Sequence, residues 1–410
     1  MENSLWWKNV VLYELYVDKF AGDFINLAAN LDYFTALGID CLHLLPHYPS
    51  PLIDDGYDIS DYRAIRSDLG TLDDFCAFVK EAHKRNIRIM TDFVLNHVSS
   101  QHPWFCEARS SNNNAKRDYF IWSETGAELK DSLNAFPHLK SSNWIYNTLT
   151  NDYYYATFYP EQPDLNWNNP RVYEEMMEIM NFWIACGVDG FRLDAASHLV
   201  KKEGTSSKGL EETHALLKNI RSHLVHTAPE VALLAEVHDT LDEVKKYFGN
   251  GRGDECNLAY HFQVSEDLML AVIRNDRAQV DTLIAASSDI PADCQWVAFL
   301  RNHDELSLKT LDSDAAKELL DYCDPERKYL FDKNKGLSMR LASMFGGDTQ
   351  KIKNAFSLLL SLPASVVIYY GEEIGMVNDE SIGEQKDTRR YVRGTFPTFN
   401  LQVQPGDKFF

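Results

Sequence analysis

Basic residues are scarce in this sequence. Its 40 lysines and arginines face 61 aspartates and glutamates, which gives a net charge of −21 over 410 residues. Proteins that bind nucleic acid need clustered Lys and Arg to hold the phosphate backbone, so this balance argues against a nucleic-acid partner. The acidic surface favours solubility, and a pocket lined by its carboxylates should prefer neutral or cationic ligands.

Clustered cysteines and long apolar runs are also missing. The seven cysteines are scattered, with no Cys-x-x-Cys pair, so we expect free thiols and neither a disulfide framework nor a zinc site. The apolar run at 356–370 is shorter than a bilayer span and contains a proline. The N-terminus has no basic start and no apolar core of a signal peptide. These absences predict a cytoplasmic protein that is not associated with a membrane. They leave its oligomeric state open.

Short apolar runs rich in β-forming residues alternate with longer segments of helical period. Amphipathic helices are expected between several of the runs, for example where Asn169 and Pro170 start one. Eight such units are typical of an α/β fold, the (β/α)₈ TIM barrel. A doubly wound sheet gives a similar alternation, but the number of units favours the barrel. The eight predicted strands begin near residues 10, 41, 87, 190, 231, 256, 295 and 365.

One interval departs from this alternation. Between His97 and Asn169 the sequence is polar and aromatic, with a weak helical period. Long excursions that keep aromatic residues commonly build the walls of binding sites. We therefore predict a small inserted domain at residues 98–169, after the third strand. The catalytic barrel would then consist of residues 1–97 and 170–410.

Charged side chains stand at the carboxyl ends of the predicted strands. Arg192 and Asp194 close the fourth strand, Glu236 closes the fifth, and His303 and Asp304 follow the seventh. In a barrel, this end of the strands is where active sites are assembled. Arg192 and Asp194 are two residues apart, so both point to the same side, where the guanidinium would hold Asp194 ionised. The apolar run VALLA before Glu236 should desolvate its carboxyl group and raise its pKa toward that of a general acid.

A pair of carboxyl groups, one ionised and one protonated, is what glycoside hydrolysis requires. A retaining mechanism places the two groups roughly 5 Å apart, which neighbouring barrel strands allow. Taken singly, each of these residues could equally be a structural ion pair or a helix cap. Together, so many charges at successive strand ends cost stability unless they serve a site. The pattern therefore predicts chemistry at a glycosidic bond.

Five ordered motifs resemble those of the α-amylase superfamily (glycoside hydrolase family thirteen). The resemblance extends over about residues 6–376 and implies the same barrel fold. Longer stretches such as LLPHYPSPLIDDGYDISDY and VIYYGEEIGM are similar to the branch that acts on short α-glucosides, which includes trehalose synthase (maltose α-D-glucosyltransferase) and oligo-1,6-glucosidase. The five motifs are DFVLNH (92–97), QPDLN (162–166), GFRLDA (190–195), AEV (235–237) and NHDE (302–305).

The resemblance implies roles for individual side chains. By it, Asp194 is the nucleophile, Glu236 is the acid/base, and Asp304 is the carboxylate that distorts and holds the sugar. The other implied contacts with the same sugar are stacking by Tyr57, a hold on its non-reducing end by Asp58, and contacts from His97, Arg192 and His303.

The sequence departs from the family pattern on the acceptor side and at an ion site. AASHL follows Asp194 and VHD follows Glu236, where trehalose synthases carry other residues, so the choice between water and sugar as acceptor stays open. The family's calcium site would use Asn96, Asp164 and carbonyls near residue 198. Lys201 stands where a glutamate ligand is expected, and a lysine beside a dication is unfavourable, so we predict no bound calcium, no other metal and no cofactor.

The C-terminal part departs as well. Its segment KDTRRYVRG resembles the amylosucrase ending, in which the arginine of DTR pairs with the pocket-floor acid. This makes Arg389 the candidate partner of Asp58, with Arg393 as second choice. About 34 residues follow Met376, which is too few for the family's C-terminal β-sandwich, so we expect that domain to be absent or truncated.

The sequence thus predicts a retaining enzyme that acts on the α-D-glucosidic bonds of short α-glucosides of the maltose and trehalose type. Trehalose-synthase-like glucosyl transfer or isomerisation is one reading, and an α-glucosidase or amylase-type hydrolase of the same superfamily is the alternative. A catalytically inactive barrel that binds a sugar or a protein is an alternative of another class. The presence of Asp194, Glu236 and Asp304 argues against it.

Overall fold

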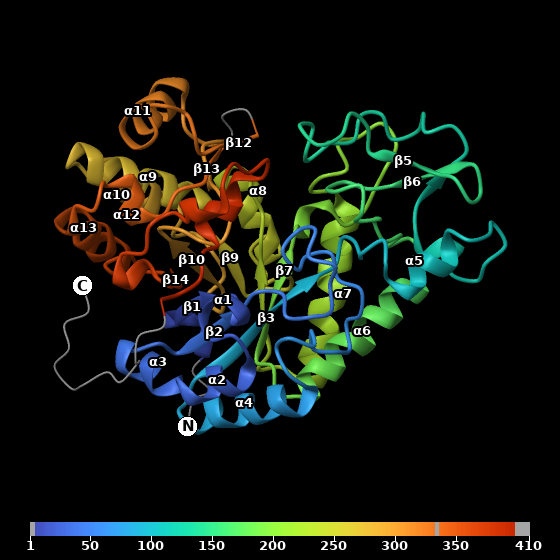
Figure 1. The fold of residues 1–410 in the computed structure, drawn as a ribbon, viewed down its shortest axis with the longest axis horizontal. Coiled ribbons are helices and arrows are strands. Elements are labelled where there is room, and N and C mark those ends of the chain that lie inside the picture. Colours follow the sequence, from blue (N-terminus) through green and yellow to red (C-terminus); the bar gives the residue numbers. More distant parts are fainter. Residues whose placement is uncertain (1–4, 333–335, 398–410) are drawn as a thin grey trace. The chain divides into compact units, whose positions relative to one another are not determined.

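The computed structural model describes residues 5–332 and 336–397, and it is built around a barrel (Figure 1). The barrel is closed, with strand order β1-β14-β10-β9-β8-β7-β3-β2. This order confirms the predicted (β/α)₈ barrel, and each predicted strand is found. The strands are β1 (Val11–Leu15), β2 (Cys41–Leu44), β3 (Arg88–Val94), β7 (Gly190–Asp194), β8 (Ala232–Ala235), β9 (Leu258–Tyr260), β10 (Gln295–Phe299) and β14 (Ser365–Tyr369).

The barrel strands are short and buried on both faces, which explains why they appear as nearly continuous apolar runs. All residues of β7 and β10 are buried. Neighbouring strands pair in parallel, with Asp92 of β3 opposite Arg192 of β7 and Leu193 of β7 opposite Ala235 of β8. This register sets where the polar residues at the strand ends emerge.

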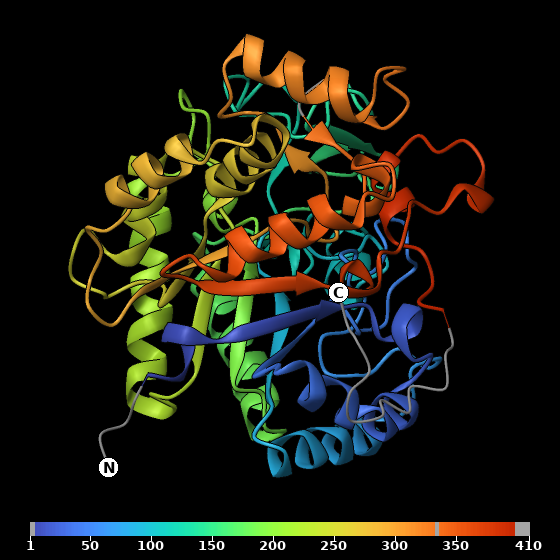
Figure 2. The same cartoon turned by 90° about the vertical axis from the view of Figure 1, so that its left-hand side faces the viewer.

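The chain forms two compact units. Unit 1 comprises Met1–Leu44, Lys80–Ile89 and His238–Phe410, and unit 2 comprises Leu45–Val79 and Met90–Val237. In unit 1, β1 and β14 lie side by side (Figure 2). The helix α9 (Phe262–Arg274) contacts three others and shares an apolar core with them, to which Leu268, Leu319 and Leu359 belong. These three are α10 (Ala278–Ala286), α11 (Ser313–Cys323) and α13 (Thr349–Leu360).

Unit 2 carries a second sheet, which lies within the predicted insertion. Its antiparallel strands have the order β4-β6-β5, and an isolated bridge joins His97 to Asp164. The strands are β4 (Trp122–Ser123), β5 (Trp144–Asn147) and β6 (Asp152–Tyr155). That residues 98–169 form a separate domain stays a prediction.

The helix α6 (Pro170–Ala185) begins where the sequence indicated, because the Asn169 side chain accepts a hydrogen bond from the Arg171 N–H. The helix α5 (Pro103–Ala108) packs against β6 through Phe105 and Tyr154, and α7 (Glu211–Thr227) also belongs to unit 2.

Three other expectations concern thiols, membranes and the C-terminal part. All seven cysteines are free thiols, as predicted, although Cys106 is exposed. Within residues 5–332 and 336–397, no helix has both the length and the apolar character that a bilayer crossing needs. After β14 the described residues form 3₁₀ turns such as η7 (Thr388–Val392), while residues 398–410, on which the β-sandwich prediction partly falls, lie outside the described residues.

Candidate active site

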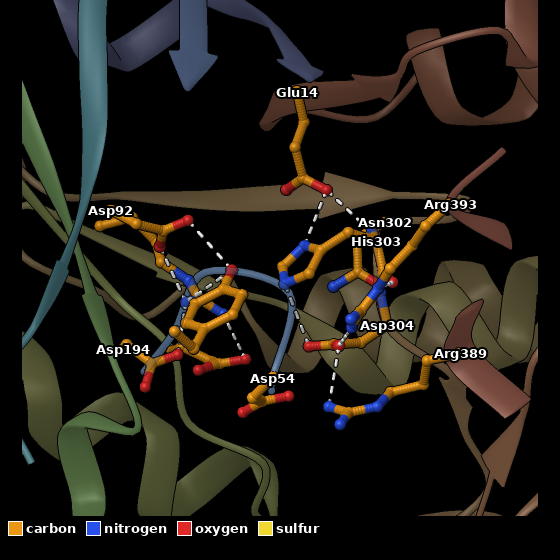
Figure 3. A network of polar contacts seen from close by, with 12 residues as sticks. Glu14, Asp54, Asp92, Asp194, Asn302, His303, Asp304, Arg389 and Arg393 are labelled. Carbon is orange, nitrogen blue, oxygen red and sulfur yellow. Dashed lines mark hydrogen bonds and ion pairs between the residues drawn. The ribbon is translucent and has the colours of Figure 1, made fainter. Parts of the chain in front are cut away.

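The first group of polar residues lies in unit 2, around the guanidinium of Arg192. Its Nη1 is 2.8 Å from Asp92 Oδ1 and 2.6 Å from Asp194 Oδ1, and its Nη2 is 2.6 Å from Glu236 Oε1. Arg192 and Asp92 are buried, whereas the side chains of Asp194 and Glu236 are 13% and 12% exposed. Figure 3 labels Asp92 and Asp194 in this cluster. The two carboxylates that the sequence singled out as nucleophile and acid/base therefore bind one guanidinium.

The charges in this cluster are unbalanced. Burial opposes the charge on Arg192, but the carboxylates of Asp92, Glu236 and Asp194 outweigh burial and raise its pKa above the usual value. The guanidinium is therefore always charged, and it favours the ionised form of Asp194 that a nucleophile needs. Three carboxylates around one cation leave two excess negative charges when all are ionised. Such a cluster favours a transition state that develops positive charge, as an oxocarbenium-like sugar does.

Glu236 has polar neighbours that its sequence context does not reveal. It follows the apolar strand β8, yet its Oε2 accepts a 3.0 Å hydrogen bond from the Ala195 N–H and its Oε1 faces Arg192. Both contacts favour the carboxylate form, which is the base form of an acid/base residue. Ala195 has a left-handed backbone (φ 47°), a strained conformation that orients this N–H toward Glu236. The sequence argument from the apolar VALLA run considered only burial of Glu236 and did not include its contacts with Ala195 and Arg192.

Tyr57 and His97 lie in the same unit. The Tyr57 hydroxyl donates to Asp92 Oδ2 at 3.0 Å, and its ring centroid is 5.6 Å from Arg192 Cζ. His97 follows β3, where its Nδ1 lies 3.3 Å from the Asn96 amide nitrogen. Its Nε2 is buried and has no hydrogen-bond partner within the part of the chain that the structure describes. A buried ring nitrogen without a partner is a natural contact for a hydroxyl group of a ligand.

Burial lowers the pKa of His97 to about 4, so its ring is neutral at neutral pH. Because the unfolded chain binds a proton here below about pH 6.5 and the folded chain does not, stability should fall as the pH drops from 6.5 to 4. At pH values near or below the folded-state pKa, this effect lowers the free energy of unfolding by about 3 kcal/mol. The effect is absent in His97→Asn, which has no titrating ring. Urea unfolding of both proteins at pH 7.5 and pH 4 should therefore show that the difference between their free energies of unfolding changes by this amount. A difference independent of pH would contradict the assignment.

Asp58 directly follows Tyr57, and its carboxylate is bound by groups of the loop that precedes it. Its Oδ1 accepts from the Ser50 hydroxyl at 2.9 Å and its Oδ2 from the Ile53 N–H at 3.0 Å. Burial raises the pKa of Asp58, and these hydrogen bonds oppose the shift only in part. The role of Asp58 at the sugar's non-reducing end stays a prediction.

Asp54 is a second buried carboxylate of this loop, which the sequence analysis did not single out. Its Oδ2 accepts a 2.9 Å hydrogen bond from the amide of Gln162, the first residue of the QPDLN motif. Figure 3 includes Asp54 among the polar residues drawn. The sequence signal that could have found Asp54 is the acidic pair Asp54 and Asp55 directly before Gly56. The hydrogen bond from Gln162 links this loop to the inserted segment.

Lys201 lies among the residues that the family resemblance gives to a calcium ion. Its Nζ is 2.8 Å from Asp164 Oδ2 and 2.7 Å from Asn96 Oδ1, and it donates to the His198 carbonyl. The lysine side chain is only 2% exposed, and burial lowers its pKa although Asp164 opposes the shift. An ammonium group thus binds the oxygens that the resemblance gives to calcium, and the absence of a bound metal stays a prediction.

The second group of polar residues lies in unit 1, after β10. Asp304 Oδ1 accepts from Arg393 Nη2 at 2.7 Å and from Arg389 Nη1 at 3.2 Å, and its Oδ2 is 3.2 Å from His303 Nε2 (Figure 3). Its side chain is 17% exposed. Charge-assisted donors on both carboxylate oxygens favour the ionised form and fix its orientation.

Arg389 was expected to pair with Asp58. In unit 1 it forms a two-point contact with Asp387, with Nε 3.0 Å from Oδ1 and Nη2 2.6 Å from Oδ2, in addition to its bond to Asp304. Its pairing with Asp58 stays a prediction.

Glu14 is a further residue of this group that the sequence analysis missed. It is fully buried on β1, where its Oε1 lies 3.0 Å from His303 Nδ1 (Figure 3). The signal that could have found it is a single carboxylate inside the otherwise apolar strand VLYEL.

Comparison with known proteins places the sequence among enzymes of sugar chemistry. Residues 8–324 match the family described as "Alpha amylase, catalytic domain". The trehalose synthase/amylase TreS of Mycobacterium tuberculosis (strain ATCC 25618 / H37Rv) is 42% identical over 393 residues, which cover 94% of this chain and 65% of that protein. The oligo-1,6-glucosidase of Bacillus cereus is 32% identical over 412 residues, which cover 93% of this chain and 68% of that protein.

A solved structure extends the comparison to the fold. The crystal structure of the trehalulose synthase MutB from Pseudomonas mesoacidophila MX-45 matches with a TM-score of 0.75 at 27% identity. The match covers 95% of this chain and 70% of that one. The chain therefore spans about two thirds of the length of these relatives.

Proposed function

Because the chain belongs to the α-amylase family, we propose that it is a retaining enzyme that acts on the α-D-glucosidic bonds of short α-glucosides. The observation that carries the proposal is the pair Asp194 and Glu236, whose carboxylates bind the two terminal nitrogens of Arg192, each at 2.6 Å. A retaining mechanism needs two carboxyl groups side by side, about 5 Å apart. Two carboxylates on one guanidinium satisfy the need for close neighbours.

In the proposed mechanism, Asp194 attacks the anomeric carbon while protonated Glu236 gives its proton to the leaving oxygen. A covalent glucosyl-enzyme forms, and Glu236, now a carboxylate, takes a proton from the acceptor hydroxyl that displaces Asp194. Arg192 keeps Asp194 ionised. Asp304 is assigned the sugar hydroxyls through family membership, and its ionised, doubly anchored carboxylate suits that role. His97 Nε2 is assigned a hydroxyl of the same sugar.

The proposal further assigns the enzyme to glucosyl transfer or isomerisation of the trehalose synthase type. A relative with 42% identity over 94% of this chain is named a trehalose synthase/amylase, and one of the matching structures is a trehalulose synthase. The oligo-1,6-glucosidase match supports hydrolysis as the alternative, and so does the departure of AASHL and VHD from the trehalose synthase pattern.

The same proposal covers domain roles and location. Residues 98–169 would act as an inserted domain beside the catalytic barrel, supported by their separate antiparallel sheet. The substrate is a small α-glucoside. A cytoplasmic location is supported by the seven free thiols, since reduced cysteines are typical of that compartment.

Incubation with maltose tests the proposed reaction. Trehalose as the main product, with little free glucose, is the expected result. Glucose alone would assign the enzyme to the hydrolases. Sucrose and trehalose serve as further substrates, and Asp194→Asn serves as the control for contaminating activity. Binding of these sugars without any turnover would contradict the enzyme assignment and favour the inactive barrel.

A further inference from the structure

Glu14 is a fully buried carboxylate to which the reaction above gives no role. Its Oε1 accepts a 2.9 Å hydrogen bond from the His303 backbone N–H and lies 3.0 Å from His303 Nδ1. Its Oε2 lies 3.2 Å from His43 Nδ1 and 3.4 Å from the Tyr260 hydroxyl. All four residues belong to unit 1, on β1, β2, β9 and the loop after β10. Both carboxylate oxygens therefore face donors, and His303 contributes two of them.

His303 lies between two carboxylates. Its Nδ1 faces Glu14, and its Nε2 is 3.2 Å from Asp304 Oδ2 (Figure 3). A neutral imidazole has one N–H, so only the doubly protonated ring can donate to both carboxylates at once. The backbone around the ring is fixed as well, because Arg393 Nε donates to the His303 carbonyl at 2.9 Å.

The charge state of Glu14 supports this chain of contacts. Burial acts to raise its pKa, but His303 and His43 outweigh burial, so the pKa of Glu14 is lowered well below its usual value. Glu14 is thus ionised at any working pH. Glu373, another buried carboxyl group of unit 1, accepts hydrogen bonds from the hydroxyls of Tyr13 and Tyr33, at 2.6 and 2.7 Å, and burial raises its pKa.

We propose that Glu14 is a positioning residue, which fixes the orientation of the His303 ring so that its Nε2 faces Asp304 and holds that carboxylate in place for the sugar. Burial of a carboxylate carries a desolvation cost that an apolar residue in a barrel strand would avoid. A carboxylate at this position is explained if Glu14, through His303, sets the orientation of Asp304. The inference rests on the proposed function, because only there does Asp304 contact substrate.

Glu14→Gln keeps the shape of the side chain and removes its charge. We expect kcat/KM on maltose to fall about 10- to 100-fold, as when the carboxylate behind a functional histidine is removed. The charged and titratable groups that the structure shows facing Glu14 or His303 in unit 1 include Tyr16, His43, Tyr260, Asp304 and Arg393.

Matched variants separate positioning from folding. Glu14→Asp, which restores the carboxylate, should recover most of the lost kcat/KM. Glu373→Gln changes another buried carboxyl group of unit 1 and should leave kcat/KM close to that of the unaltered protein, whatever it does to the melting temperature. An equal fall in Glu373→Gln, or none in Glu14→Gln, would overturn the proposal.

A double-mutant cycle tests whether Glu14 acts through His303. In a His303→Asn background, adding Glu14→Gln should change kcat/KM little, because the ring on which Glu14 acts is gone. If Glu14→Gln lowers kcat/KM by the same factor in both backgrounds, Glu14 acts by another route and the proposal fails.

A readout without turnover separates this inference from the proposed function. In ¹⁵N-histidine NMR spectra, the His303 ring signals, identified by their loss in His303→Asn, should shift in Glu14→Gln and stay in place in Glu373→Gln. A protein that turns over no α-glucoside but shows this shift would contradict the proposed function and keep the contact between Glu14 and His303. Active protein whose His303 signals do not change in Glu14→Gln would overturn the inference alone.

Discussion

Asp194→Asn should lower kcat on maltose by on the order of 10⁴- to 10⁶-fold, as the loss of a catalytic nucleophile does. The amide of asparagine cannot attack the anomeric carbon, so no glucosyl-enzyme forms. The fold should tolerate the change, because asparagine has nearly the same shape and Arg192 keeps its contacts with Asp92 at 2.8 Å and with Glu236 at 2.6 Å. The measurement is steady-state turnover of maltose together with a thermal melt, which should stay close to that of the unaltered protein.

Glu236→Gln is the matched control, since it removes the other carboxylate of the same guanidinium. A leaving group that needs no proton, such as p-nitrophenolate, should still be expelled in this variant, so a glucosyl-enzyme on Asp194 should accumulate and be detectable by mass spectrometry. Asp194→Asn should give no such adduct with any leaving group. Full activity of Asp194→Asn on maltose would refute the assignment of nucleophile, acid/base and reaction class together.

The barrel could be predicted because its signals are local. Each barrel strand is an apolar run bounded by polar segments, and the Asn169–Pro170 pair marks a helix start that the structure confirms. The shared orientation of Arg192 and Asp194 also follows from local geometry, since residues two apart on a strand point to one side. Their contact at 2.6 Å is what that spacing predicts.

Partners that lie far apart in the sequence could not be predicted in the same way. Periodicity tells which face of an element is buried, but the partner on that face depends on strand register and side-chain rotamers. Glu236 meets the Ala195 N–H across neighbouring strands, 41 residues away. Glu14 meets His303 at a separation of 289 residues, and nothing near Glu14 in the sequence indicates this histidine.

Lys201→Met should cause the largest loss of stability among these variants. It removes the ammonium group 2.8 Å from Asp164, a fully buried carboxylate, and leaves that charge without its cation. Breaking a buried ion pair from one side costs about 3–5 kcal/mol, which for a chain of this size corresponds to a drop of roughly 4–6 °C in melting temperature. The hydrogen bond from the Thr157 N–H to Asp164, at 2.9 Å, compensates in part. Urea unfolding and differential scanning calorimetry measure the change.

Lys140→Met is the control that isolates the charge effect. Lys140 is also buried in unit 2, and burial lowers its pKa to about 8, but its hydrogen bonds go to neutral oxygens, those of Asn134 at 3.2 Å and of the Ala156 carbonyl at 2.7 Å. Methionine there removes no direct hydrogen-bond partner of a carboxylate, although the Lys140 charge also acts on Asp164 without contacting it, so the loss should be smaller than in Lys201→Met. Equal losses would mean that burying a long side chain matters more than pairing Asp164. A larger loss in Lys201→Met would instead support an ammonium group that stabilises the oxygens of Asn96, Asp164 and the loop at His198 as a bound cation would.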